Sequence, residues 1–324
     1  MSPFGHYLVF ILLLSTSVSN VFASSYDNAK PLKLEQHWAL SGVENLQPSG
    51  LSVCGAKLIM VSDRHSDKIF SIPLSNKPTT EVETYRTLSP FTDLPEQIRW
   101  QERLMDWGLR WTQKRFDWEG IHCNPDGTIF LASESLSAVA TVEPDGSSRW
   151  ITPSFINQLR THTFASSLNT GFEGIAADEQ QLYLAIEREP RGLLSVSMLT
   201  LPPRIDNLKI VDQEGVISPL SADFTGLWLE KPSGQPVKIY TLERNYFRVC
   251  RRHYDTWEIE VCWRYRDTEK STAFRFESDH FGLAEGIARL GDAVYIVLDN
   301  NDQPRRLNSS RNPLLFKFKR PDNW

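Results

Sequence analysis

The chain repeats one pattern of polar and apolar positions five times. Each copy opens with a polar residue, a glycine and then Leu or Ile, passes through a short turn, and ends in an apolar run that closes on an acid. Apolar runs such as 58–61 and 129–132 are too short and too rich in strand-forming residues for helices. The pattern therefore predicts two β-strands per copy, joined by a tight turn. The glycines that mark the copies are Gly50, Gly120, Gly174, Gly226 and Gly286.

The spacing of these copies predicts the architecture. Further strand-like sequence follows each copy, which gives an antiparallel sheet of about four strands per repeat. Repeats of this kind are typical of a β-propeller. We expect an all-β fold, a single propeller with five blades, or six if the long interval between Gly50 and Gly120 holds a degenerate blade. Residues 314–318 are expected to close the ring beside 37–40.

One segment has a helical rather than a strand pattern. Near residues 94–114, the apolar side chains of Ile98, Leu104, Met105 and Leu109 are spaced to share one face of a helix. We expect a short helical insertion there, within the first interval between copies.

The first residues resemble a targeting segment. Residues 7–14 are uncharged and apolar, residues 15–20 are small or polar, and Val21 and Ala23 are small residues suited to a cleavage site. We expect a signal peptide over 1–23 and a propeller domain over 24–324, with a periplasmic or secreted location; the alternative is a buried strand or helix. The apolar run is far shorter than the roughly 20 residues of a membrane span.

Four cysteines lie in the predicted mature chain. An even number in an exported protein favours disulfides. Cys250 and Cys262 flank a predicted hairpin, which makes a cross-strand bridge easy. Cys54 and Cys123 then pair by elimination, and they occupy similar places in consecutive copies. Free buried thiols are the alternative, and the absence of a C-x-x-C pair argues against zinc.

Equivalent positions of the repeats should converge on the central channel and form two rings. The first ring is the residue before each glycine, namely Ser49, Glu119, Glu173, Thr225 and Glu285. The second is the acid that ends each apolar run, namely Asp63, Glu134, Glu187, Glu243 and Asp299.

Glutamates that converge in a narrow channel repel one another and lose hydration. One solution is a hard cation held by Glu119, Glu173 and Glu285, with Ca²⁺ the natural choice outside the cytoplasm. The other is structural: each glutamate pairs with an arginine or accepts backbone N–H bonds from the neighbouring blade. For the second ring the structural solution is favoured, because Arg64, Arg188 and Arg244 each directly follow one of its acids.

Charge and motifs exclude several functions. Lys and Arg number 35 and Asp and Glu 40, a net charge of −5 without any basic run, so nucleic acid is not an expected partner. There is no G-x-S-x-G elbow, no phosphate-binding P-loop and no H-E-x-x-H. We expect a monomer that takes a small molecule or phosphoester as its ligand.

Three motifs, taken in order, resemble the phytase-like family described as "esterase-like activity of phytase". They are residues 116–121 (FDWEGI) with 125–128 and 132–134, residues 171–176 (GFEGIA) with 182–185, and residues 284–288 (AEGIA) with 297–302 (VLDNND). The resemblance implies an exported bacterial propeller with esterase or phosphoesterase activity, without a defined set of catalytic residues. A more distant likeness is to calcium-dependent lactonase propellers, which place a Glu-Gly at the channel mouth.

Two hypotheses for function follow. The first is a metal-dependent hydrolase of ester or phosphoester bonds at the channel mouth, with a glutamate as base. The second is a propeller without enzymatic activity that binds a ligand or a protein there.

Overall fold

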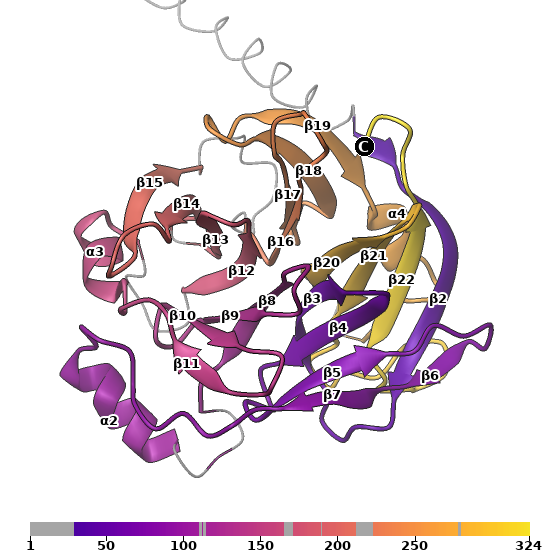
Figure 1. Ribbon diagram of the computed structural model, residues 1–324. Coiled ribbons are helices and arrows are strands. Elements are labelled where there is room, and N and C mark those ends of the chain that lie inside the picture. Colours follow the sequence, from indigo (N-terminus) through magenta and orange to yellow (C-terminus); the bar gives the residue numbers. More distant parts are fainter. Residues whose placement is uncertain are drawn as a thin grey trace, which may run out of the picture.

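Five β-sheets are arranged around one central axis (Figure 1). The computed structural model describes residues 29–109, 112, 115–164, 171–188, 190–211, 223–277 and 280–324. The predicted signal peptide over 1–23 lies outside these residues. The prediction of an all-β, five-bladed propeller is confirmed.

The blades follow one another along the chain, and each starts at the axis and ends at the rim. Blade 1 contains β3 (Pro48–Cys54), β4 (Lys57–Ser62), β5 (Lys68–Ile72) and β7 (Glu83–Thr87). Blade 2 contains β8 (Trp118–Cys123), β9 (Ile129–Ser133), β10 (Ala138–Val142) and β11 (Ser148–Trp150). Blade 3 contains β12 (Phe172–Ala177), β13 (Gln181–Ile186), β14 (Gly192–Ser197) and β15 (Arg204–Ile210).

The last two blades each carry an additional outer strand from the amino-terminal half. Blade 4 contains β16 (Gly226–Glu230), β17 (Lys238–Glu243), β18 (Arg248–His253) and β19 (Ile259–Arg264), with β1 (Lys30–Pro31) parallel to β19. Blade 5 contains β20 (Ala284–Leu290), β21 (Ala293–Leu298), β22 (Leu314–Lys319) and β2 (Lys33–Ser41), with β6 (Thr79–Glu81) parallel to β2.

Strands from the two ends of the chain close the ring. β22 pairs antiparallel with β2, so that Ala39 lies opposite Leu314 and His37 opposite Phe316. The predicted closure is therefore confirmed. The long interval between the first two copies holds β5, β6, β7 and a helix instead of a sixth blade.

Apolar side chains fill the space between neighbouring sheets. Strand β9 shows how the alternation works: Ile129 and Leu131 pack with blade 1 residues, whereas Phe130 and Ala132 pack with blade 3 residues. Successive side chains of a strand point to opposite faces, and both faces of these sheets are covered. This explains why the inner runs of the repeats are continuously apolar.

The described residues contain three short helices, which lie outside the blades: α2 (Trp100–Leu109), α3 (Ile156–Thr161) and α4 (Arg266–Glu269). Among the described residues, no helix is long and apolar enough to cross a membrane. Helix α2 lies within the predicted insertion, at the periphery of the molecule (Figure 1).

The prediction of an apolar inner face on α2 is wrong in part. Leu104 is 59% exposed, whereas the carboxylates of Glu102 and Asp106 are buried. Arg99 pairs with Glu102 at 2.7 Å and Arg115 with Asp106 at 2.7 Å. These two ion pairs, rather than an apolar stripe, hold the inner side of the helix.

Both predicted disulfides are present. Cys250 and Cys262 lie directly opposite each other on β18 and β19, with Cα atoms 4.1 Å apart. Cys54 of β3 and Cys123 of β8 join blades 1 and 2, with Cα atoms 5.3 Å apart. One bridge therefore fastens a single blade, and the other fastens two neighbouring blades together.

The repeated glycines let the five inner strands meet at the axis. A Cβ added to Gly120 would lie 2.9 Å from Ile175 N of blade 3, and one on Gly174 would lie 2.9 Å from Leu227 N of blade 4. The same contact closes the circle, because a Cβ on Gly286 would lie 2.6 Å from Leu51 N of blade 1. Backbones this close leave no room for a side chain.

The ring is not equally tight everywhere, which supplies a matched test. A Cβ on Gly226 would find its nearest neighbour at 3.4 Å, an ordinary contact. We predict that Gly286→Ala lowers the free energy of unfolding by about 1–3 kcal/mol through overpacking, and that Gly226→Ala lowers it less. Urea unfolding of the two variants measures the difference. Equal losses would contradict the role of close backbone approach.

Candidate functional site

A cavity of about 250 Å³ lies on the channel and is lined mainly by acids. Three of its carboxylates come from the first predicted ring, namely Glu119, Glu173 and Glu285. Four come from the second ring, namely Asp63, Glu134, Glu187 and Asp299. The structure thus brings seven of the predicted acids to one place.

Strand irregularities aim the first ring into the channel. The pairing of β8 with β9 skips Glu119, that of β12 with β13 skips Glu173, and that of β20 with β21 skips Glu285. A bulged residue leaves the ladder, and its side chain is redirected. The residue before the glycine is therefore free of strand pairing in these three copies.

The two hydroxyl members of the first ring have a structural role. Ser49 donates a hydrogen bond to the Trp118 carbonyl oxygen of blade 2, and Thr225 donates one of 2.7 Å to the Ala284 carbonyl oxygen of blade 5. Each links its blade to a neighbour, which is the structural alternative expected from the sequence. Glu173 differs, because it makes no hydrogen bond or ion pair with any residue that the structure describes, although it is only 6% exposed.

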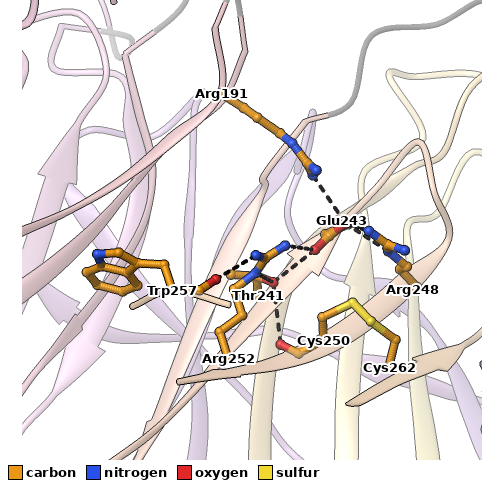
Figure 2. Close-up of a disulfide and its surroundings, with 8 residues drawn as sticks. All are labelled: Arg191, Thr241, Glu243, Arg248, Cys250, Arg252, Trp257 and Cys262. Carbon is orange, nitrogen blue, oxygen red and sulfur yellow. Dashed lines mark hydrogen bonds and ion pairs between the residues drawn. A yellow bond between two sulfur atoms is a disulfide. The ribbon is translucent and has the colours of Figure 1, made fainter. Parts of the chain in front are cut away.

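Glu243 does not join the second ring. It lies inside blade 4, where three arginines surround its carboxylate: Arg191 at 3.1 Å, Arg248 at 2.7 Å and Arg252 at 2.7 Å (Figure 2). Arg252 also donates to the Trp257 carbonyl oxygen. The expectation of five converging acids is therefore wrong at this position, because neighbouring strands supply guanidinium groups that hold the carboxylate in the blade.

Arg244 neutralises one side of the channel. Its Nε donates to Asp223 at 2.7 Å, its Nη2 to Glu187 at 2.8 Å, and its Nη1 to Glu285. Burial alone would lower the pKa of Arg244, but the carboxylates of Glu285, Asp223 and Glu187 raise that pKa well above its usual value. Arg244 directly follows Glu243 in the sequence, but in the structure it contacts three acids from other segments.

Arg188 Nη1 also lies 2.5 Å from Glu187 Oε1, whereas Glu119, Glu134 and Glu173 have no arginine or lysine partner among the described residues. Burial raises the pKa of Glu119, Glu134 and Glu173 well above the usual range, and the negative charge of neighbouring carboxylates raises it further. Around the mouth, burial raises the pKa of Asp63 to about 6 and that of Asp299 to about 7. These carboxylates therefore favour either a proton or a bound cation.

Two groups of three carboxylates have the geometry of a metal site. Oxygens of Asp117, Glu119 and Glu134 lie within 4.8 Å of one another, and so do oxygens of Glu134, Glu173 and Glu187. Two oxygens bound to one Ca²⁺ lie at most about 5 Å apart, because each is 2.3–2.6 Å from the ion. Both groups fit this limit and share Glu134. Glu285 belongs to neither group, and its Oε1 accepts a hydrogen bond from Arg244.

Sequence reasoning missed Asp117 as a member of the site. Asp117 directly precedes β8 and has a left-handed backbone, with φ of +49°. The only sequence signal was its place two residues before Glu119, in Asp117-Trp118-Glu119.

Comparisons with known proteins concern the fold more than the site. Residues 112–235, less than half of the chain, match the model of the family described as "SdiA-regulated". This description differs from the phytase-like one, which stays a prediction. No curated protein matches the chain.

Several solved propeller-like structures show distant likeness. Virginiamycin B lyase from Staphylococcus aureus is 11% identical with a TM-score of 0.40, over 88% of this chain and 74% of that chain. Aldose sugar dehydrogenase from Streptomyces coelicolor, in its PQQ-bound form, is 11% identical with a TM-score of 0.44, over 90% and 99%. A chain of a nidogen/laminin complex is 14% identical with a TM-score of 0.42, over 82% of each chain. At this level of similarity, none of them informs the chemistry of the channel.

The raised pKa values predict how stability depends on pH. Asp63 and Asp299 bind protons more tightly in the folded than in the unfolded chain, so the free energy of unfolding of metal-free protein should fall as pH rises from about 4 to about 8. We expect a loss of at least about 2 kcal/mol over that range, measured by urea unfolding at several pH values. Asp299→Asn should make the slope shallower. A pH dependence that is the same in Asp299→Asn as in the wild type would contradict the buried acidic channel.

The arginine cage of Glu243 predicts a large and local effect. Glu243→Gln removes the only carboxylate that the structure shows at the centre of the cage and leaves like charges together, so unfolding free energy should fall by about 3–5 kcal/mol. Glu260→Gln is the control in the same blade, because the Glu260 side chain is 39% exposed and its ion pair with Arg251 is worth at most about 1 kcal/mol. Chemical unfolding compares the two variants. Similar small losses in both would contradict a structural role for Glu243.

Proposed function

We propose that the channel binds a divalent cation, Ca²⁺ in particular, and that the protein is a metal-dependent hydrolase of ester or phosphoester bonds at the channel mouth. The observation that carries the proposal is Glu173, a buried carboxylate without a hydrogen bond or ion pair among the described residues, within 4.8 Å of oxygens of Glu134 and Glu187. A buried charge without a partner is costly, and a cation would remove that cost. The resemblance of the repeats to the phytase-like family supports the choice of reaction.

Each residue of the channel has a distinct task in this proposal. Glu134, Glu173 and Glu187 hold the cation, and Arg244 keeps Glu187 in place through its 2.8 Å bond. A bound divalent cation supplies polarisation of the substrate and a lower pKa for a water molecule. Asp63 and Asp299 line the same cavity outside both groups of three, where either carboxylate would be placed to act as the general base.

The location also belongs to this proposal. Two disulfides favour an oxidising compartment. The expected signal peptide agrees with export to the periplasm or the medium, and Ca²⁺ is abundant outside the cytoplasm.

A second candidate function is a ligand- or protein-binding propeller without catalysis. Arg244 favours it, because this internal cation already pairs with Glu187 and Glu285 and so neutralises part of the ring. In that case the remaining carboxylates would bind a cationic group of a ligand.

Removal of one carboxylate tests the cation site. Glu173→Gln keeps size and hydrogen-bonding capacity but removes one negative charge, so we expect Ca²⁺ affinity to fall at least about ten-fold. Isothermal titration calorimetry measures that change, with Glu260→Gln as the control that removes a carboxylate far from the channel. Wild-type protein should also be stabilised by about 2.7 kcal/mol at a Ca²⁺ concentration 100-fold above its Kd.

Hydrolysis assays then separate the two functions. Wild-type protein with Ca²⁺ should cleave 4-nitrophenyl acetate or bis(4-nitrophenyl) phosphate, and Glu173→Gln or a chelator should abolish that activity. Ca²⁺ binding without cleavage of either compound would favour the binding propeller. No Ca²⁺ binding by the wild type would overturn the cation site itself.

A further inference from the structure

A second cavity opens beside the channel, between blades 1 and 5, with a volume of about 830 Å³. It is lined by the connection from β2 to β3, by the turn after β4, by β5 and β7, and by Asp302 of the connection from β21 to β22. We refer to it as the side cavity. None of the proposed cation ligands, Glu134, Glu173 and Glu187, lines it.

The side cavity and the channel share a wall. Gln47 lines both. Consecutive residues divide between them at two further places: Asp63 lines the channel and Arg64 the side cavity, while Asn301 lines the channel and Asp302 the side cavity. The two cavities are therefore direct neighbours.

The chemistry of the two cavities differs. The channel lining has seven acids and two arginines, whereas the side cavity has two acids, two permanent cations and further hydrogen-bond donors; the donors come from Asn45, Gln47, Arg64, Lys68 and Thr84. Such a set of donors, with two permanent cations, suits a ligand group that carries several negatively charged oxygens.

Arg64 is held in an orientation suited to binding. Its Nε donates to the Gln47 amide oxygen and lies 3.4 Å from Asp63 Oδ2. Within the described part of the chain, its two Nη groups have no hydrogen-bond partner, and the side chain is about one-third exposed. An arginine anchored through Nε can present both Nη groups to an oxyanion in a forked arrangement.

Two acids, Glu44 and Asp302, also line the side cavity, and the carboxylate of Glu44 makes no hydrogen bond or ion pair with any residue that the structure describes. Asp302 is paired with Arg311 at 3.2 Å. Glu44 is an exposed residue whose carbonyl oxygen accepts a 3.2 Å bond from His65 Nε2. Lys68 Nζ lies 4.0 Å from Asp67, at the limit of an ion pair, which leaves it able to turn toward a ligand.

We propose that the side cavity binds an oxyanion group of the substrate, a phosphate or a carboxylate, while the ester bond to be cleaved lies in the channel. The binding part stands on Arg64, Lys68 and the shared wall at Gln47, and the placement of the ester bond rests on the proposed function. The expected substrate is thus an ester with a second, negatively charged substituent that the reaction leaves intact.

Metal-free protein tests this site without the channel cation. Protein is treated with EDTA, dialysed and titrated with inorganic phosphate or with succinate by calorimetry. We expect binding of at least one of the two anions, with affinity reduced about ten-fold or more in Arg64→Gln and in Lys68→Gln. Lys319→Gln, which removes an exposed cation from β22, is the control and should bind like the wild type. Preference for phosphate or for succinate identifies the oxyanion.

Two outcomes would overturn the side cavity as a binding site. One is the absence of binding at about 10 mM anion. The other is binding that requires Ca²⁺ and is unchanged in Arg64→Gln and Lys68→Gln, which would place the anion on the metal. Glu173→Gln separates this test from that of the proposed function: it should lose Ca²⁺ affinity yet retain anion binding. Thermal melts of all variants verify that each is folded.

Discussion

The close approach of five backbones at the axis is the constraint on which the rest of the structure depends. Around most of the ring, a Cβ on the repeated glycine would lie within 3.0 Å of backbone in the next blade. Inner strands at that distance bring the residue before the glycine to the channel in four of the five copies, and bulges turn Glu119, Glu173 and Glu285 into it. The acidic channel is thus a consequence of how the ring closes. The Cys54–Cys123 disulfide and the hydrogen bonds of Ser49 and Thr225 hold neighbouring blades at this spacing.

Two buried acidic centres show different solutions to the same electrostatic problem. Three arginines surround the Glu243 carboxylate: Arg248 and Arg252 from β18 of blade 4, and Arg191, which directly precedes β14 of blade 3. Their positive charges lower the pKa of Glu243 although this residue is completely buried. In the channel, Arg244 forms ion pairs with Asp223, Glu187 and Glu285, whereas Glu119 and Glu173 have no arginine partner among the described residues. This asymmetry is the physical basis for placing a cation beside Glu134. Two chemically distinct surfaces lie next to each other at the channel mouth: the carboxylates of the channel and the hydrogen-bond donors of the side cavity.

Sequence patterns predicted the features that depend on local periodicity. The E-G-I repeats predicted the blades, and apolar runs near the two ends of the chain predicted the closing strands. A hairpin within one copy predicted the Cys250–Cys262 pair, and elimination predicted Cys54–Cys123, which occupy similar places in consecutive copies. The same reasoning was wrong for Glu243, because Arg191, Arg248 and Arg252 bind its carboxylate inside blade 4 and keep it out of the channel. Helix α2 likewise buries Glu102 and Asp106 because Arg99 and Arg115 reach them. The three-way contact of Arg244 joins segments far apart in sequence, and no spacing rule predicts it.

Anomalous X-ray diffraction from crystals soaked in Mn²⁺ or Tb³⁺ as substitutes for Ca²⁺ tests the cation site most directly. We predict an anomalous peak in the channel within coordination distance of Glu134 and Glu173, with Glu285 still bound to Arg244. A channel without a peak, under conditions where surface carboxylates are labelled, would contradict the account and would leave the acids of the ring as structural groups.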